Sequence, residues 1–411
     1  LMYANVILKN TGIGAASDVA GYFNIIDIPA GKYTLTVSMI GYEKTEKEVF
    51  VLSGLEERHD FNVNPMSIEG GEVIVTGDRQ RFEKEIEVSS VNLSMREVKI
   101  MPAFIEADIF RTAQLLPGVQ TSSDFSSALV VRGGSPDENL IMLDGIEIYN
   151  PFHLGGVFST FNADAIADVE FLTGGYPARY GNRISSVLNL TSRTGDSKQH
   201  KFFDEQGLGK YFDLSQVHGE INLLSSKIVA EGPICRGSWV LSARRTYFDE
   251  IAKLYYYSVQ EPMDWKYYFY DVHGKVVQNL NSNNRVSISS YGGLDHINFE
   301  ISEDEGTVDF DWTWGNSSRS IEWRWVPNTR FVSTLSLAGS EYHFNMNLEY
   351  TSTDSKGSSS GGNYKVWNAI EDWTIRENLD WYISSEHKAT LGLEVKNLGV
   401  EFDLGVGDVK Y

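Results

Sequence analysis

The second half of the chain alternates apolar and polar residues in short runs. Apolar side chains occupy every second position from 308 to 314 and again from 321 to 325, and residues 388–396 repeat the pattern. A period of two predicts β-strands with one apolar face. That face would lie in the core of a soluble β-sandwich, or would contact lipid if the strands belong to an outer-membrane barrel.

Aromatic content favours the barrel. The chain has nine Trp and 21 Tyr, with clusters at 255–257 and 265–270, and such residues are typical of the membrane interface. We therefore expect the apolar members of the alternating runs, among them Trp323 and Leu391, to face lipid. The polar stretch Thr351–Asn363 is then an extracellular loop, although its Ser and Gly content equally suits a disordered linker.

The first half of the chain has a different rhythm. Residues Phe104–Leu116 place Ile105, Ile109 and Ala113 on one face, which predicts a helix that Pro117 and the following glycine stop. Three later apolar runs are separated by Gly-rich turns and predict short strands. They lie at positions 129–131, 140–143 and 187–190.

Composition excludes several classes of function. The net charge of -21 lacks the basic face that a nucleic-acid binder needs. The single cysteine, Cys235, can form neither an intrachain disulfide nor a cysteine-based zinc site. The metalloprotease, nucleophile-elbow and P-loop motifs do not occur. We therefore expect no enzyme, no metal site and no cofactor.

An ordered series of motifs within residues 130–194 carries a resemblance. A short helix-like segment, Asn162–Ala167, lies among them. The motifs are Val131-Arg132-Gly133-Gly134, Leu140-Ile141-Met142-Leu143-Asp144-Gly145, Val169-Glu170-Phe171-Leu172, Pro177-Ala178-Arg179-Tyr180-Gly181 and Val187-Leu188-Asn189-Leu190. Together they resemble the plug domain of TonB-dependent outer-membrane receptors. The resemblance implies a plug inside a transmembrane β-barrel.

The first residues resemble a second family. Gly21-Tyr22-Phe23, Ile28-Pro29-Ala30-Gly31-Lys32-Tyr33 and Met39-Ile40-Gly41-Tyr42 are similar to the carboxypeptidase regulatory-like domain, a non-catalytic β-sandwich often found ahead of such plugs. The expected chain is mainly β, with an N-terminal β-sandwich, a mixed α/β plug and an incomplete antiparallel transmembrane β-barrel. The expected boundaries are 1–65 for the sandwich, 66–100 for a hinge, 101–195 for the plug and 196–411 for the first part of the barrel.

The last segment has room for about eight to ten strands, whereas the barrel of the family has about 22. The regulatory-like domain normally has one more strand before Met2. We therefore expect a chain truncated at both ends.

The hinge contains a candidate partner-binding segment. Residues Glu72, Val73, Ile74, Val75 and Thr76 follow Gly70-Gly71 and, before a plug, are similar to the TonB box. Such a segment binds an inner-membrane energy-transducing protein of the TonB type as an added strand, through main-chain hydrogen bonds. Without that context the same residues would be an ordinary edge strand.

Three plug loops, at 121–127, 133–139 and 149–156, correspond by position to apices that face the outside and contact substrate in this family. They are rich in Ser, Gly, Pro and Asn. The residues able to bind or stack on a ligand are Asp124, Phe125, Asp137, Glu138, Tyr149, Phe152 and His153. The resemblance also implies that Arg132 and Glu170 are latch residues whose charges hold the plug within the barrel.

The function implied by the resemblance is active import across the bacterial outer membrane, in contact with its lipid. The ligand could be a siderophore, haem, cobalamin, a glycan or a peptide. The alternative is an adhesion or signalling protein for which the barrel is only an anchor.

Overall fold

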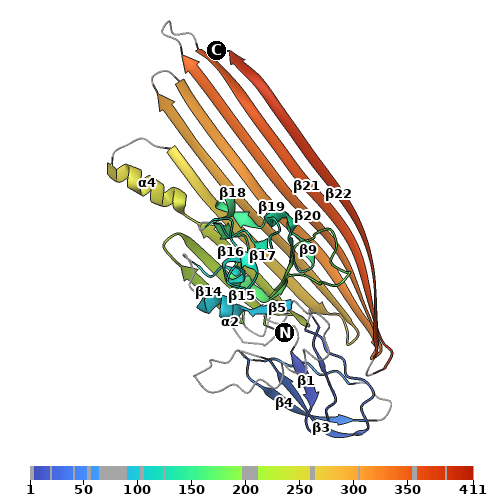
Figure 1. Cartoon of the computed structure of the whole chain (residues 1–411). Helices are drawn as coiled ribbons and strands as arrows, with labels where there is room; N and C mark the ends of the chain where they lie inside the picture. The colour runs from blue at the N-terminus through green and yellow to red at the C-terminus, as the bar shows by residue number, and fades with distance from the viewer. Residues whose placement is uncertain are drawn as a thin grey trace.

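The computed structural model describes residues 4–18, 21–39, 42–52, 57–63, 90–101, 106–123, 126–196, 212–259, 264–303, 306–353, 359–384 and 387–410. These residues form an N-terminal domain, a plug and one large sheet, which we call the wall sheet (Figure 1). Within these ranges, none of the helices is both long and apolar enough to cross a membrane.

The N-terminal domain contains one four-stranded antiparallel sheet of order β2-β1-β3-β4. Its strands are β1 (Asn5–Leu8), β2 (Gly14–Ala16), β3 (Gly31–Ser38) and β4 (Thr45–Val51). Alternation in β1 buries Val6 and Leu8, which pack with Leu35, Val37 and Val49. Strand alternation of this kind gives the domain its own apolar core.

The plug is built on a five-stranded sheet of order β5-β12-β13-β8-β9. The strands are β5 (Ser90–Ser94), β8 (Leu140–Leu143), β9 (Ile146–Glu147), β12 (Ile166–Leu172) and β13 (Val187–Ser192). The β8–β13 pair is parallel. Its central strands β12, β13 and β8 are almost entirely buried on both faces, as expected for a sheet that is covered on both sides.

Short elements complete the plug. They are α2 (Met95–Ile100), α3 (Ile109–Ala113), β6 (Val119–Gln120), β7 (Val130–Val131), η1 (Pro136–Glu138), β10 (Phe152–His153), η2 (Leu154–Gly156), β11 (Phe158–Ser159) and η3 (Ala163–Ala165). We predicted a helix over Phe104–Leu116. Within the described residues of this range, the helix is the shorter α3. The helix-like segment at 162–167 is a single 3-10 turn, because Ile166 already begins β12. Strand β5 comes from the expected hinge and is part of the plug sheet.

The wall sheet has nine antiparallel strands in chain order. They are β14 (Gln216–Ile221), β15 (Ser225–Ile234), β16 (Gly237–Thr246), β17 (Asp264–Asn279), β18 (Asn284–Glu303), β19 (Gly306–Asn328), β20 (Phe331–Thr353), β21 (Ser359–Tyr382) and β22 (Lys388–Lys410). Helix α4 (Phe248–Val259) lies between β16 and β17. In the described part of the chain β14 and β22 are not paired, which confirms the expected open antiparallel sheet.

Strand continuity corrects one expectation about loops. We expected an extracellular loop from Thr351 to Asn363, but β20 extends to Thr353 and β21 begins at Ser359. The polar residues of this stretch pair across the two strands, so that Thr351 lies opposite Gly361. Ser and Gly are compatible with a strand here because neighbouring backbones supply the hydrogen bonds.

The wall sheet inverts its apolar face along its length. Asp271 and Lys275 contact the plug, so their side of β17 is the inner face of the wall sheet. Residues paired across neighbouring strands lie on the same face, and the pairing therefore places the even-numbered residues of β19 on the inner face. Trp323 and its neighbours at 321 and 325 therefore point outward, whereas Trp312 points inward on the same strand. The expectation that both runs face lipid is wrong for 308–314. The apolar residues lie at even positions up to 314 and at odd positions from 321, and no bulge interrupts the register between the two runs.

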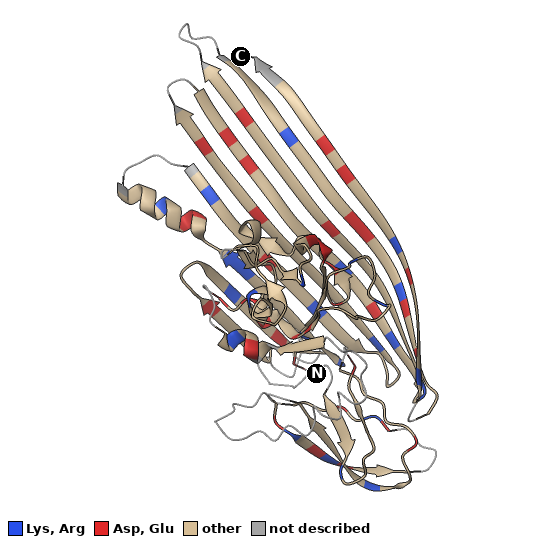
Figure 2. Ribbon diagram, viewed as in Figure 1, with Lys and Arg blue, Asp and Glu red and all other residues tan. Residues whose placement is uncertain are grey.

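All five long strands share this inversion. In the lower part, towards the short turns at 280–283 and 329–330, the outward positions are apolar, as at Ile321, Leu337 and Leu391. In the upper part the outward positions are mostly polar and the inward positions are apolar. Figure 2 shows mainly acidic residues on these upper parts; outward-facing examples are Asp309, Asp311, Glu349, Glu401 and Asp403.

The plug lies against the lower half of the wall sheet, and the N-terminal domain lies beyond the short turns (Figure 1). Asp18 forms an ion pair with Arg324 at 3.1 Å, and the guanidinium of Arg324 lies 3.5 Å from the ring centre of Tyr22. Asp27 pairs with Arg330 at 3.2 Å in a neighbouring turn. These contacts dock the domain on the lower rim of the wall.

Candidate functional site

The interface between plug and wall contains a buried charged cluster, which we call the central cluster. Its plug members are Glu106 and His153, and its wall members are Arg244, Asp271 and Asp295. The Arg244 Nε donates to Asp271 at 2.8 Å, and its Nη1 contacts Glu106. His153 Nε2 lies 2.9 Å from the other oxygen of Asp271, and Nδ1 contacts Asp295. Each carboxylate therefore has a cationic partner across the interface.

Packing fixes the position of the His153 ring. The ring stacks on Phe269 with centroids 3.9 Å apart, and the next backbone amide, of Leu154, donates to Asp295 at 3.1 Å. Burial by itself would lower the pKa of His153, but the charges of Asp271 and Asp295 raise it to about 9. The ring is therefore a cation at neutral pH.

The plug helix α3 is tied to the same region. Asp108 caps the helix by accepting from the Arg111 amide at 3.1 Å, and its second oxygen accepts from the Ser159 amide at 2.8 Å. Burial raises the pKa of Asp108, although both amide bonds oppose the change. Because the carbonyl of Ser159 also accepts from Arg244, the cap, the loop and the wall form one connected unit.

Two further contacts lie outside the central cluster, one on β17 and one on β15. Lys275 donates to Asp144 at 3.0 Å, and Asp144 also accepts from the Ser192 amide at 3.0 Å. Lys227 pairs with Asp164 at 2.8 Å. Burial alone would raise the pKa of Asp164, but hydrogen bonds from Lys227 and Lys99 lower it to about 2. Both contacts join a plug carboxylate to a wall lysine.

Asp164 also belongs to the only potential metal-ligand group that the described residues contain. Its carboxylate lies with His218 and Glu220 so that one atom of each is within 4.8 Å of the others. However, the ammonium of Lys227 already contacts Asp164 and Glu220. A metal ion would have to compete with this bound cation, so the geometry favours an ion-pair network.

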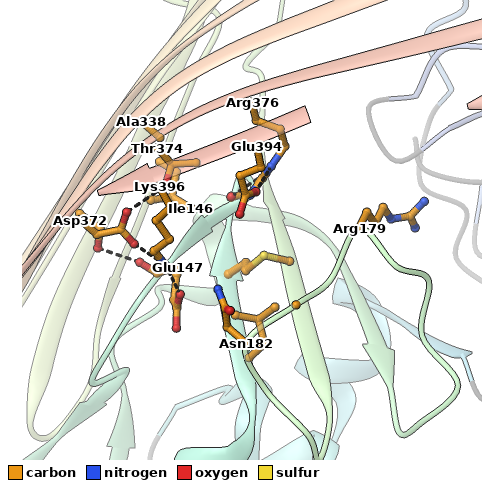
Figure 3. A pocket seen from close by; sticks show the side chains of 15 residues that line it. Ile146, Glu147, Arg179, Asn182, Ala338, Asp372, Thr374, Arg376, Glu394 and Lys396 are labelled. Carbon is orange, nitrogen blue, oxygen red and sulfur yellow. Dashed lines mark hydrogen bonds and ion pairs between the residues drawn. The ribbon is translucent and has the colours of Figure 1, made fainter. Parts of the chain in front are cut away.

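A fourth contact lies beneath β21 and β22 and borders a cavity of about 40 Å³ (Figure 3). Lys396 projects from the wall and contacts Glu147 and Asp372, each at 2.6 Å. The hydroxyl of Tyr149 donates to Asp372 at 2.7 Å, and Arg183 contacts Glu147 from within the plug. The cavity is polar and has room for a few water molecules.

The predicted ligand-contact residues lie in different environments. Asp137 is exposed on η1, where a hydrogen bond from Ser135 lowers its pKa, and Glu138 accepts from the Ser135 amide at 3.1 Å. Phe152 is half-buried and its ring lies 5.2 Å from that of Phe110. Tyr149 and His153 contact the wall as described above. Asp124 and Phe125 lie outside the described residues, as do Glu72, Val73, Ile74, Val75 and Thr76.

The two predicted latch residues have partners within the plug. Arg132 is exposed and donates to Thr173 at 3.1 Å. Glu170 is fully buried and accepts from Tyr180 at 3.3 Å and Asn189 at 3.5 Å. Their role in holding the plug to the wall stays a prediction, whereas other residues make the contacts across the interface that are described above.

Sequence reasoning missed the wall cations Arg244, Lys275, Lys227 and Lys396. A signal was present, because each is a charged residue at an inward position of an alternating strand. An inward charge needs a partner, since burying it alone costs several kcal/mol. The partners themselves lie up to 249 residues away, as for Lys396 and Glu147, and no local pattern identifies them.

In this geometry a mixed α/β domain is held against the inner face of a long-stranded antiparallel sheet. Residues 1–75 match the CarboxypepD_reg-like domain, and residues 103–187 match the TonB-dependent receptor plug domain. The plug match and the similarity to a TonB-dependent transporter confirm the resemblance to TonB-dependent receptors seen in residues 130–194.

Individual relatives are distant. The TonB-dependent transporter Oar of Myxococcus xanthus is 24% identical over 196 residues, which cover 45% of this chain and 18% of that protein. A chain of the RagAB peptide importer in its open-open state has a TM-score of 0.51 and 11% identity over 80% of this chain and 49% of that chain. The ferric enterobactin receptor of Pseudomonas aeruginosa has a TM-score of 0.39 and 11% identity, over 79% and 60% of the two chains. This chain thus spans less than two thirds of the proteins it matches.

Proposed function

We propose that the chain is the gated part of a transporter that imports a ligand across the outer membrane with energy from a TonB-type partner. The observation that carries this proposal is the set of buried ion pairs between plug and wall. They come from five different strands, β15, β16, β17, β18 and β22. A plug held on so many strands closes the path along the inner face until it moves.

Moving such a plug requires work. Each buried pair that loses its partner before water arrives costs about 3–5 kcal/mol, so thermal motion alone opens the plug rarely. An external partner that pulls on the plug would supply this energy. The same argument disfavours a simple membrane anchor for an adhesion protein. An anchor does not require a plug whose interface with the wall is closed at rest and separates when the plug is pulled.

We place the partner contact on Glu72–Thr76, which precede the plug strand β5, and the ligand contact on the exposed or half-buried loop residues of the plug. The latter are Asp137, Glu138, Tyr149 and Phe152. Asp124 and Phe125, which lie outside the described residues, are assigned the same role from their place in the sequence. His153 is buried between two wall carboxylates. We assign it the role of linking the loop at 149–156 to the wall.

The experiment compares two substitutions in the full-length receptor. Ile74→Pro removes a backbone N–H donor from the proposed added strand, whereas Ile74→Ala keeps it. Binding of the purified periplasmic domain of TonB should be lost with Ile74→Pro and largely retained with Ile74→Ala. Equal binding by wild type and Ile74→Pro would contradict the assigned partner segment and return the anchored adhesion or signalling protein to consideration.

A further inference from the structure

The upper part of the wall sheet has an apolar inner surface, which we call the upper inner face. It consists of alternate positions at 297–301, 308–314, 342–350, 364–370 and 398–406, on five adjacent strands. Among these described positions there is no charged side chain. The outward positions beside them are mostly polar, so the apolar surface faces the lumen and not lipid.

Part of this surface already binds an apolar polypeptide segment, namely the plug loop beneath it. Phe158 is packed in one cluster with Trp314, Tyr267 and Phe269 of the wall, and Leu154 and Val157 pack against the same cluster. Phe344 and Trp312 continue the cluster upward, with their rings 5.7 Å apart in an edge-to-face arrangement. The apolar wall surface that packs against the loop therefore continues above the loop.

Above that cluster the inner surface is open in the described structure. Ile301, Val308 and Tyr350 lie opposite one another in a row across β18, β19 and β20, and all three are exposed. Tyr350 stacks with Tyr364 at 6.2 Å between ring centres. Exposed aliphatic and aromatic side chains in a row favour a ligand that buries apolar groups.

The size of the upper inner face indicates the kind of ligand. Five strands about 4.8 Å apart give a width of about 19 Å, and the rise from Leu398 to Val406 is about 26 Å, so the area is on the order of 500 Å². This is comparable to one side of a small protein–protein interface. A compact, highly charged ligand would leave most of it exposed and would find no counter-charge on it.

We propose that the upper inner face binds the transported ligand, and that this ligand is a polypeptide segment held by its apolar side chains. The proposal rests on the proposed function and adds the class of substrate. The plug loop at 154–158 shows how such a segment can pack on this wall, and the absence of charge among the described positions disfavours acidic or basic cargo.

The experiment uses the full-length receptor in lipid nanodiscs and two fluorescent ten-residue peptides. One alternates Leu or Phe with Ser, and the other has Asp and Lys in place of the apolar residues. Fluorescence anisotropy, corrected with empty nanodiscs, should show much tighter binding of the apolar peptide. Equal affinity for the two peptides would overturn the proposal. Complete displacement of the apolar peptide by an uncharged aliphatic alcohol would also overturn it, because that result would indicate a site for small lipophilic molecules.

A matched pair of variants locates the site. Ile301→Ser combined with Tyr350→Ser should weaken binding of the apolar peptide about tenfold, because two apolar contacts are lost. Glu300→Ser combined with Glu349→Ser changes the adjacent outward positions and should leave binding unchanged. Equal effects of the two pairs would refute the assignment to the inner face.

Two controls separate this proposal from folding defects and from the proposed function. A photoreactive form of the apolar peptide should cross-link to the wild-type protein within 297–314 or 342–350, and cross-links confined to other regions would refute the site without any variant. Ile74→Pro should retain peptide binding. Failure of TonB binding and failure of peptide binding are thus distinguishable outcomes.

Discussion

Replacing Arg244 by methionine tests whether buried charge holds the plug to the wall. Only 3% of the Arg244 side chain is exposed, and it serves Glu106, Asp271 and the carbonyl of Ser159 at once. Methionine fills much of the volume but leaves two buried carboxylates without this cation. Removing one partner of a buried pair costs about 3–5 kcal/mol.

Hydrogen exchange followed by mass spectrometry measures this effect where it should occur. Local opening of the plug around 152–161 should become about a hundredfold to a few thousandfold more frequent, which is the same free energy expressed as a ratio. Amides in the upper parts of β19–β21 should keep their protection, because their strand pairing does not depend on Arg244.

Arg245 provides the matched control one residue along the strand. Its side chain is 46% exposed, occupies an outward position on the strand and pairs with Asp249 on α4. Such an exposed pair contributes about 0–1 kcal/mol, so Arg245→Met should leave plug exchange nearly unchanged. If Arg244→Met changed exchange by less than about threefold, the reasoning on buried ion pairs would be refuted.

Three other predictions concern separate parts of the molecule. Because the pKa of His153 is raised from 6.5 to about 9, its stabilising contribution is complete below pH 6.5 and is lost as the pH rises through 9; the thermal unfolding temperature of the plug should fall over this range, and His153→Gln should remove that part of the pH dependence. Trp323→Arg places a charge on the lower outward face and should cost up to about 2–4 kcal/mol near the membrane midplane, whereas Phe310→Arg should assemble normally in a heat-modifiability assay of folded protein in the outer membrane. Arg324→Ala removes the contacts with Asp18 and Tyr22, so limited proteolysis should separate the N-terminal domain from the plug faster, while plug unfolding stays unchanged.

The alternating runs show how far sequence reasoning reaches. The period of two at 308–314 and 321–325 correctly predicts strands, because side chains of a strand point to opposite faces in turn. The sequence shows that the apolar residues have even numbers in the first run and odd numbers in the second. If both runs belong to one unbroken strand, their apolar side chains must therefore point to opposite faces of the sheet. The expectation that both runs face lipid requires them to be separate strands, and the register of β19 shows that they are one.

The plug could be predicted from the sequence, whereas its contacts with the wall could not. Its motifs are local and ordered along the chain, so a family resemblance identifies them without knowledge of tertiary structure. The contacts between Arg244 and Glu106 or between His153 and Asp295 join residues 138 and 142 positions apart. Their pairing depends on how the plug is oriented against the wall, and no periodicity or propensity in either segment encodes that orientation.

The position of β5 has a mechanical consequence. Among the described residues this strand is at the edge of the plug sheet and pairs only with β12, from Ser90 opposite Leu172 to Ser94 opposite Asp168. A tension applied to the chain before Ser90 would load this strand first and could peel it away one hydrogen bond at a time, since an edge strand has no second neighbour to share the force. The central strands β12 and β13 would stay paired during that first step. The fold thus provides a weak seam where a pull on the preceding segment enters the plug, and the ruptured seam could close again once the tension is released.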